Sequence, residues 1–110
     1  MESIKRELKP VYDNAKSFYN KAYTITYLEN NLVYKMELYS YNTLVLTLTD
    51  GVYKLNTEVP EKLLYSQTTL RHTKDFLKQH YYNHRHEIKT KADIIKYNNV
   101  NYYKLNKEEF

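Results

Sequence analysis

The side chains best suited by type and spacing to bind a metal ion are three histidines, His80, His84 and His86. On a helix that continued through residue 84, the first two would share one face four residues apart, as zinc ligands often do. However, Tyr82-Asn83 is typical of a helix end, the chain has no cysteine, and Glu87 is the nearest carboxylate in sequence. We therefore expect no metal site and no cofactor, and interpret the histidines as exposed side chains of a basic segment.

The hydroxyl and carboxyl groups form no recognisable catalytic set. None of the four serines stands in a nucleophile elbow or a Ser-x-x-Lys context. No two acidic residues have a spacing that indicates one carboxyl group with a raised pKa beside one with an ordinary pKa. The single glycine, Gly51, excludes the Gly-rich loops that bind phosphate groups. We therefore predict that the protein is not an enzyme.

Basic side chains gather in the second part of the chain. Residues 1–65 carry eight Lys/Arg and eight Asp/Glu, whereas residues 66–110 carry nine basic and five acidic residues and so supply the whole net charge of +4. Such a segment suits an acidic partner, either nucleic acid or an acidic protein surface. The plainer alternative is that these charges only solvate a helix surface. The candidate basic binding residues are Arg71, Lys74, Lys78 and Arg85.

The 14 tyrosines have two explanations. Tyrosine is common at recognition surfaces because it brings a large rigid area and a hydroxyl group. Alternatively, an A/T-rich genome enriches Tyr, Asn, Lys and Ile without selection for binding. Only the placement of individual tyrosines can decide. We expect Tyr41, Tyr81 and Tyr82, together with Arg71, to be exposed anchors for a protein partner, because aromatic and arginine side chains dominate interface hot spots.

The hydrophobic pattern indicates the elements that position these groups. Pro10 can start a helix near residues 11–22, whose apolar face would contain Ala15, Phe18 and Ala22. The apolar period then changes to two, as in strands with one solvated face. We predict strands at residues 23–27, 32–39, 43–49 and 52–56, with turns at Glu29-Asn30-Asn31 and Asp50-Gly51. These strands would form an antiparallel meander.

A main helix is predicted near residues 66–82, where Ser66 can cap the free amide of Thr69. Its spacing places the basic residues Arg71, Lys74 and Lys78 on another face than the apolar stripe. The predicted buried stripe consists of Leu70, Thr73, Phe76, Leu77 and Tyr81.

A short helix near residues 91–97 follows the capping-box spacing of Thr90 and Asp93, and residues 100–105 alternate like a last edge strand. The predicted fold class is therefore α+β. A four- to five-stranded antiparallel meander sheet is packed by an N-terminal helix, the main helix and the short helix, in a single domain over residues 1–110.

Size and composition bound the class of protein. A chain of 110 residues with 42% hydrophobic and 27% charged residues is typical of one globular domain. No apolar run approaches the length of a membrane span, and the first residues do not resemble a secretory signal. The absence of cysteine fits a reducing compartment. We expect a soluble protein that stays in the cytoplasm and contacts no membrane; its oligomeric state stays open.

Two polar segments are not explained by sheet or helix formation alone. One is Ser40-Tyr41-Asn42-Thr43, and the other is Tyr65-Ser66-Gln67-Thr68-Thr69-Leu70-Arg71-His72 at the start of the main helix. A helix N-terminus rich in hydroxyl groups can hold a phosphate or a carboxylate. The alternative is a well-capped helix whose hydroxyl groups satisfy its own amides.

These two segments carry a resemblance to a known group of proteins. The pattern S-Y-N-T-x-V, followed by Y-S-x-T-T-x-R-H-x-x-x-F-L, is similar to that of a family of small accessory proteins of phages and mobile elements. The segment Ser17-Phe18-Tyr19-Asn20-Lys21-Ala22 also resembles the family's opening segment. The match covers about residues 14–80, and departs from the pattern at Leu70 and in the lengthened turn Glu58–Leu64.

The resemblance implies a phage or mobile-element setting, in which small non-enzymatic proteins often inhibit host defence. Anti-CRISPR proteins are the best-known class of this kind. The expected function is therefore a phage-derived inhibitor that binds a host CRISPR effector nuclease of type II, or its ribonucleoprotein. The alternative is a basic accessory protein that binds DNA or RNA directly. Because the sequence pI is about 9.1, an inhibitor of this charge cannot imitate the phosphate backbone of DNA.

Overall fold

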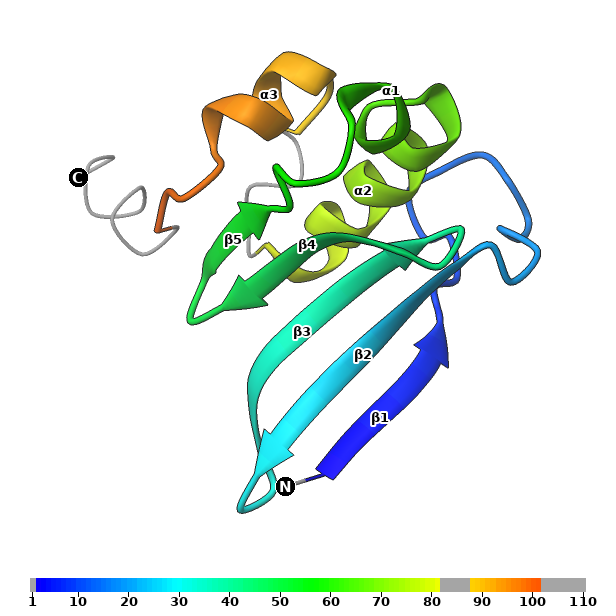
Figure 1. The fold of residues 1–110 in the computed structure, drawn as a ribbon. Helices are drawn as coiled ribbons and strands as arrows, with labels where there is room; N and C mark the ends of the chain where they lie inside the picture. Colours follow the sequence, from blue (N-terminus) through cyan, green and yellow to red (C-terminus); the bar gives the residue numbers. More distant parts are fainter. Residues whose placement is uncertain (1, 82–87, 102–110) are drawn as a thin grey trace.

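The structure, a computed structural model, describes residues 2–81 and 88–101. Five strands form one antiparallel sheet in the order β1-β2-β3-β4-β5, so that neighbours in the sequence are neighbours in the sheet (Figure 1). The strands are β1 (Glu2–Glu7), β2 (Ala22–Glu29), β3 (Leu32–Ser40), β4 (Thr43–Thr49) and β5 (Val52–Leu55). The predicted α+β class with an antiparallel meander is confirmed.

The helix predicted near residues 11–22 is wrong, because residues 8–21 form an irregular loop, called loop 8–21 below. Phe18 and Ala22 are nevertheless buried. The spacing of apolar residues therefore indicated burial correctly, but it did not indicate a helix. Two observations describe the loop that forms in place of the predicted helix. The amides of residues 11–13 donate to the side chain of Asp75, and Tyr19 and Asn20 adopt left-handed φ angles of 54° and 63°.

Among the described residues, the fifth strand of the sheet is β1, which was not predicted, and most of the edge strand predicted at residues 100–105 lies outside them. Val100 and Asn101 are not part of a strand, and residues 102–105 lie outside the described residues. The prediction missed β1 because every residue of this strand is exposed. An edge strand exposed on both faces has no alternation of apolar and polar residues from which it can be recognised.

Three tight turns connect β2 to β5, and each uses two residues in the left-handed region. Asn30 and Asn31 join β2 to β3, and Asp50 and Gly51 join β4 to β5, as expected for type I′ hairpins. The turn between β3 and β4 is Tyr41-Asn42, with φ angles of 51° and 65°. A left-handed tyrosine is uncommon, because its Cβ crowds the backbone there. The turn keeps the Tyr41 side chain on the surface.

The helices are α1 (Glu61–Leu64), α2 (Gln67–His80) and α3 (Lys91–Lys96). The short α1 was not predicted, whereas α2 and α3 confirm the main and the short helix. Both predicted caps are present: the Ser66 hydroxyl accepts a hydrogen bond from the Thr69 amide, and Thr90 forms a capping box with Asp93. These caps satisfy amides that the first helical turn leaves without partners.

The core lies between α2 and the face of the sheet that it covers (Figure 1). Thr73, Phe76, Leu77 and Tyr81 of the predicted stripe are buried, whereas Leu70 is only half-buried. The core residues from the sheet are Ala22, Leu38, Val45, Leu46, Leu48, Tyr53 and Leu55. No helix among the described residues is long and apolar enough to cross a membrane.

The segment after α2 closes the β5 edge of the sheet. The Tyr53 hydroxyl donates to the Ile94 carbonyl at 2.5 Å, which fixes α3 against β5. The Leu55 amide donates to Asn98 Oδ1 at 2.8 Å, and the Asn99 amide donates to the Tyr53 carbonyl at 2.9 Å. The backbone of β5 is therefore paired on both of its sides.

Candidate functional site

A buried hydrogen-bonded cluster joins β3 to the start of α2. The Ser40 hydroxyl lies 2.8 Å from His72 Nδ1 and 3.1 Å from the Thr69 hydroxyl. All three residues are at most 4% exposed. The two polar segments singled out in the sequence therefore meet in the structure, and their polar groups bond to one another.

The surroundings of this cluster decide between its two interpretations. The His72 ring packs edge-on against Phe18, with 4.6 Å between ring centroids, and lies 6.0 Å from the Tyr41 ring. Ser66 caps α2 and Thr69 bonds to Ser40, so both hydroxyl groups are used internally. The cluster fits a structural link and not an anion site, as in the alternative of a well-capped helix.

His72 is expected to make the fold less stable in acid. Burial, and next the nearby Arg71 charge, lower the pKa of the His72 imidazole. Below about pH 6.5 the unfolded chain therefore binds a proton that the folded protein resists, and the free energy of unfolding should fall with decreasing pH. Urea unfolding at neutral pH and near pH 5 measures this decrease. His72→Gln should show a smaller decrease than the unchanged protein, and an equal decrease in both would contradict the prediction.

The predicted basic residues Arg71, Lys74 and Lys78 do lie together on one face of α2. They line a cleft of about 380 Å³ between α2 and loop 8–21. Arg71 is not available as a free cation, because its Nη2 lies 2.5 Å from Asp13 Oδ1 and its Nε lies 3.0 Å from Asp13 Oδ2. The structure therefore brings the three residues together but neutralises one of them.

Asp75 holds loop 8–21 against α2. Its side chain is 1% exposed and accepts hydrogen bonds from the backbone amides of Val11, Tyr12 and Asp13 at 2.9–3.2 Å. Gln79 Nε2 also donates to Asp75, at 2.7 Å. One buried carboxyl group thus satisfies three consecutive amides of a loop that has no secondary structure of its own.

Asp13 is fixed at the mouth of the cleft by these contacts. The hydrogen bond from Arg71, aided by the Ala15 amide and by the Lys74 charge, lowers the pKa of Asp13 to about 2. The same pair raises the pKa of Arg71. The cleft is lined by two acidic and three basic side chains, so its surface is mixed and not uniformly basic.

Three exposed tyrosines lie on loop 8–21 and on the neighbouring β3–β4 turn, and Tyr12 also lines the cleft. Tyr12 is 43% exposed, Tyr19 75% and Tyr41 50%. The Tyr41 amide donates to the Lys21 carbonyl at 2.8 Å, so the β3–β4 turn lies beside the end of loop 8–21. We call Tyr12, Tyr19 and Tyr41 the tyrosine patch. Of the predicted anchors, Tyr41 is exposed as expected, and Arg71 lies in the adjoining cleft.

The other predicted anchors do not join this patch. Tyr81 as an exposed anchor is wrong: it is 0% exposed, its ring packs edge-on against Tyr53 at 4.9 Å, and its hydroxyl donates to the Val100 carbonyl at 2.8 Å. Tyr82 and Arg85 lie outside the described residues, as do His84 and His86. Within residues 2–81 and 88–101, no three metal-ligating side chains come together.

Comparison with known proteins places the chain in one family. Residues 6–96 match the model of a family of unknown function, DUF8033. The chain belongs to this family. No curated protein and no solved structure matches the chain. The part matched to DUF8033 contains loop 8–21, the tyrosine patch, the cleft and the buried Ser40–His72 cluster, so all of these features lie within the family's domain.

One face of the sheet is covered by no described helix of this DUF8033 domain (Figure 1). The register of β2 and β3 places Tyr23, Tyr27 and Tyr39 on this face, opposite to the buried Ala22 and Leu38. Tyr23 and Tyr39 stack at 4.9 Å, and the Lys5 ammonium lies 4.2 Å from the Tyr23 ring centroid. The Tyr27 hydroxyl donates to Glu37 at 2.6 Å, which raises the pKa of Tyr27 to about 12. These rings are engaged with each other and with neighbouring charges, so they are poorly placed to stack on nucleic-acid bases.

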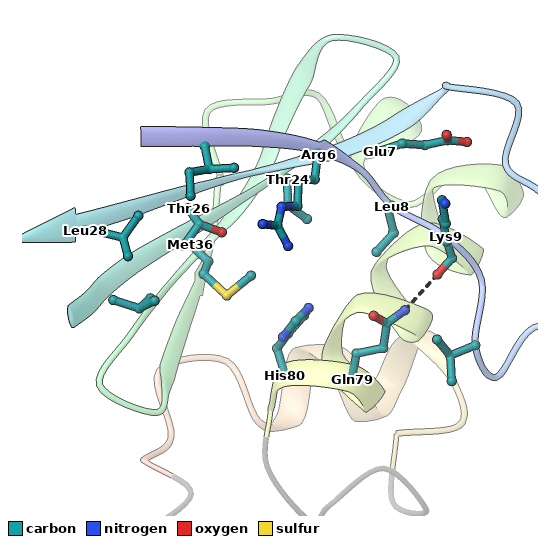
Figure 2. A pocket seen from close by; sticks show the side chains of 13 residues that line it. Arg6, Glu7, Leu8, Lys9, Thr24, Thr26, Leu28, Met36, Gln79 and His80 are labelled. Carbon is teal, nitrogen blue, oxygen red and sulfur yellow. Dashed lines mark hydrogen bonds between the residues drawn. The ribbon is translucent and has the colours of Figure 1, made fainter. Parts of the chain in front are cut away.

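An apolar groove opens on the other face, beside the end of α2. It measures about 890 Å³ and lies between β1, β2 and β3 and the last turn of the helix (Figure 2). The side chains of Arg6, Thr24, Thr26 and Met36 face His80 across it. Among the described residues that line the groove, Glu7 is the one acidic side chain, and most of the lining surface is apolar.

Sequence reasoning missed Tyr12, Tyr19 and the acidic residues Asp13 and Asp75. The last two are 62 positions apart, and nothing in the local pattern relates them. One feature of the sequence could have indicated a turn at Tyr19. Asn20 follows it, and asparagine readily adopts the left-handed conformation that both residues have in the structure.

Proposed function

We propose that this protein acts by stoichiometric binding to a partner protein and not by catalysis, and that the tyrosine patch and Arg71 make the contact. The observation that carries the proposal is the exposure of Tyr12 and Tyr19 on loop 8–21, and of Tyr41 on the neighbouring β3–β4 turn. The buried Asp75 holds this loop through the amides of residues 11–13. Tyrosine and arginine are the residues most enriched at interface hot spots. A loop already held in place loses little entropy on binding.

The setting of the proposal comes from the resemblance to phage and mobile-element accessory proteins. In that setting the partner is a host defence nuclease in the bacterial cytoplasm, and a type II CRISPR effector or its ribonucleoprotein is the specific candidate. A protein with net charge +4 would then bind an acidic protein surface or the nucleic acid within the complex.

Direct binding of DNA or RNA is the second candidate function. Lys74 and Lys78 favour it, because neither side chain forms a hydrogen bond or a close ion pair with another described residue. Asp13 and Asp75 in the same cleft oppose it, since carboxyl groups repel phosphates. The cleft therefore supports a protein contact better than a phosphate contact.

A nuclease-inhibition assay with a panel of host effectors tests the leading proposal. Tyr19→Ala and Tyr41→Ala should each weaken inhibition by about thirtyfold if they are hot spots worth ~2 kcal/mol. Ile95→Ala on α3 is the matched control, because Ile95 is also exposed, at 47%, but lies far from the patch in the chain. Equal inhibition by all three variants would overturn the role of the tyrosine patch.

Gel-shift titration at two salt concentrations tests the second candidate. If the cleft binds phosphates, Lys74→Ala combined with Lys78→Ala should reduce the slope of log affinity against log salt by about two contacts. Arg71 is left unchanged in this variant because its removal would release Asp13. If the protein binds free nucleic acid tightly and in a salt-dependent way, and inhibits no nuclease, direct nucleic-acid binding would be favoured over the leading proposal.

A further inference from the structure

The two edges of the sheet differ in how their backbone groups are satisfied. At the β5 edge, Asn98 and Asn99 hydrogen bond to Leu55 and Tyr53. At the β1 edge, no described residue pairs with the outer side of the strand. An open edge presents a row of amides and carbonyls that can add a further strand. The β1 edge is therefore the place where another chain could extend this sheet.

The register of the sheet shows which groups of β1 are free. The Leu8 amide donates to the Ala22 carbonyl, at 2.9 Å, on the side of β2. In an antiparallel ladder, residues two apart turn their backbone groups to the same side. Ile4 and Arg6 therefore bond to β2, whereas Ser3 and Lys5 direct their amides and carbonyls outward.

We propose that β1 pairs with β1 of a second copy of this chain, antiparallel, about a twofold axis that passes between the two Ile4 residues. The amide and carbonyl of Ser3 then bond to the carbonyl and amide of Lys5 in the second copy. The twofold axis repeats this pair between Lys5 and Ser3 of the second copy, which gives four backbone hydrogen bonds. The sheet continues from one copy into the other. The contact is isologous, as in most homodimers.

Charge selects this register. With Ile4 opposite Ile4, Glu2 lies opposite Arg6 of the second copy and Arg6 lies opposite its Glu2, so the strand is complementary to itself. Moving the axis to Lys5 would place two lysines opposite each other and leave Glu2 without a basic partner. A twofold axis halfway between two consecutive residues is excluded. It would place a residue whose amide and carbonyl point outward opposite one whose amide and carbonyl point towards β2, so the two could not hydrogen bond.

The apolar groove lies on the same face as the proposed Ile4 contact. Ile4 is 36% exposed and lines the groove. Arg6, Leu28 and Met36 line it as well (Figure 2). A twofold axis perpendicular to the sheet keeps the same face of both copies on one side. The two Ile4 side chains would therefore cover each other, and the grooves of the two copies would lie next to each other.

Analytical ultracentrifugation of the full chain, from low micromolar to about 1 mM, tests the proposal. The expected result is a shift from the 13.4 kDa of one chain towards twice this mass. Glu2→Arg and Arg6→Glu should each weaken the dimer by about tenfold, because each places two like-charged pairs across the axis. The combined variant restores opposite charges and should recover the dimer.

Lys5→Pro provides a second, independent variant. It removes an outward amide without touching the hydrogen bonds between β1 and β2, so it should abolish the dimer in a chain that still folds by circular dichroism. A monomer at every concentration would overturn the proposal and leave the edge to a different partner. A dimer insensitive to both charge reversals, or one not recovered in the combined variant, would overturn it as well.

Discussion

Replacing Asp75 by alanine should lower the free energy of unfolding by about 3 kcal/mol and release loop 8–21 from α2. The change removes the acceptor of three backbone amides, those of Val11, Tyr12 and Asp13. A buried donor left without a partner costs ~1–3 kcal/mol. Because water can reach part of this loop, the expected loss of stability is smaller than three times this cost. Urea unfolding measures the loss, and hydrogen exchange of these three amides reports the loop itself.

Asp75→Asn is the matched control, because it keeps the shape of the side chain but only one of its two oxygens. The free energy of unfolding of Asp75→Asn should lie between that of the unchanged protein and that of Asp75→Ala. The prediction has a consequence for the proposed function. If Asp75 holds the tyrosine patch in place, Asp75→Ala should also weaken partner binding at temperatures where the protein is still folded. A stability change within ~0.5 kcal/mol would place Asp75 among ordinary surface residues.

The second large effect is expected for Leu77→Ala, which should cost ~2–5 kcal/mol of stability. Leu77 is 0% exposed and lies on the side of α2 that packs against the sheet. The loss combines the transfer free energy of the removed methyl groups with the cavity that they leave. Leu63→Ala is the control, since Leu63 on α1 is 51% exposed and its truncation should stay within ~0.5 kcal/mol. If Leu77→Ala and Leu63→Ala had the same denaturant midpoint, this result would contradict the assigned orientation of α2.

The confirmed predictions rest on patterns that are local in the chain. Hairpins with Asn30-Asn31 and Asp50-Gly51 at their turns require left-handed residues, and these residue types adopt that conformation easily. The start of α2 at Ser66 and the capping box at Thr90 depend on side chains three residues from the amides that they satisfy. Such features can be predicted because each involves only a few consecutive residues.

The predictions that were wrong concern segments where a distant residue competes with local preference. The spacing of Ala15, Phe18 and Ala22 fits a helix face, but a loop that buries Phe18, followed by a strand that buries Ala22, shows the same spacing. Asp75, more than 60 positions away, binds the amides of residues 11–13 and so holds this loop against α2. Tyr81 illustrates the same limit, because its burial depends on Tyr53 and the Val100 carbonyl, which only folding brings to it.

Patterns in the chain were sufficient to predict the α+β class, the meander of β2 to β5, the position of α2 and the shared face of Arg71, Lys74 and Lys78. The folded structure was needed to find that Asp13 neutralises Arg71, that Ser40 and His72 join into one buried cluster, and that β1 forms an open edge. The difference lies in the range of the interactions. Periodicity and capping act within a few residues, whereas ion pairs, buried hydrogen bonds and strand pairing join residues whose distance in sequence carries no information about their distance in space.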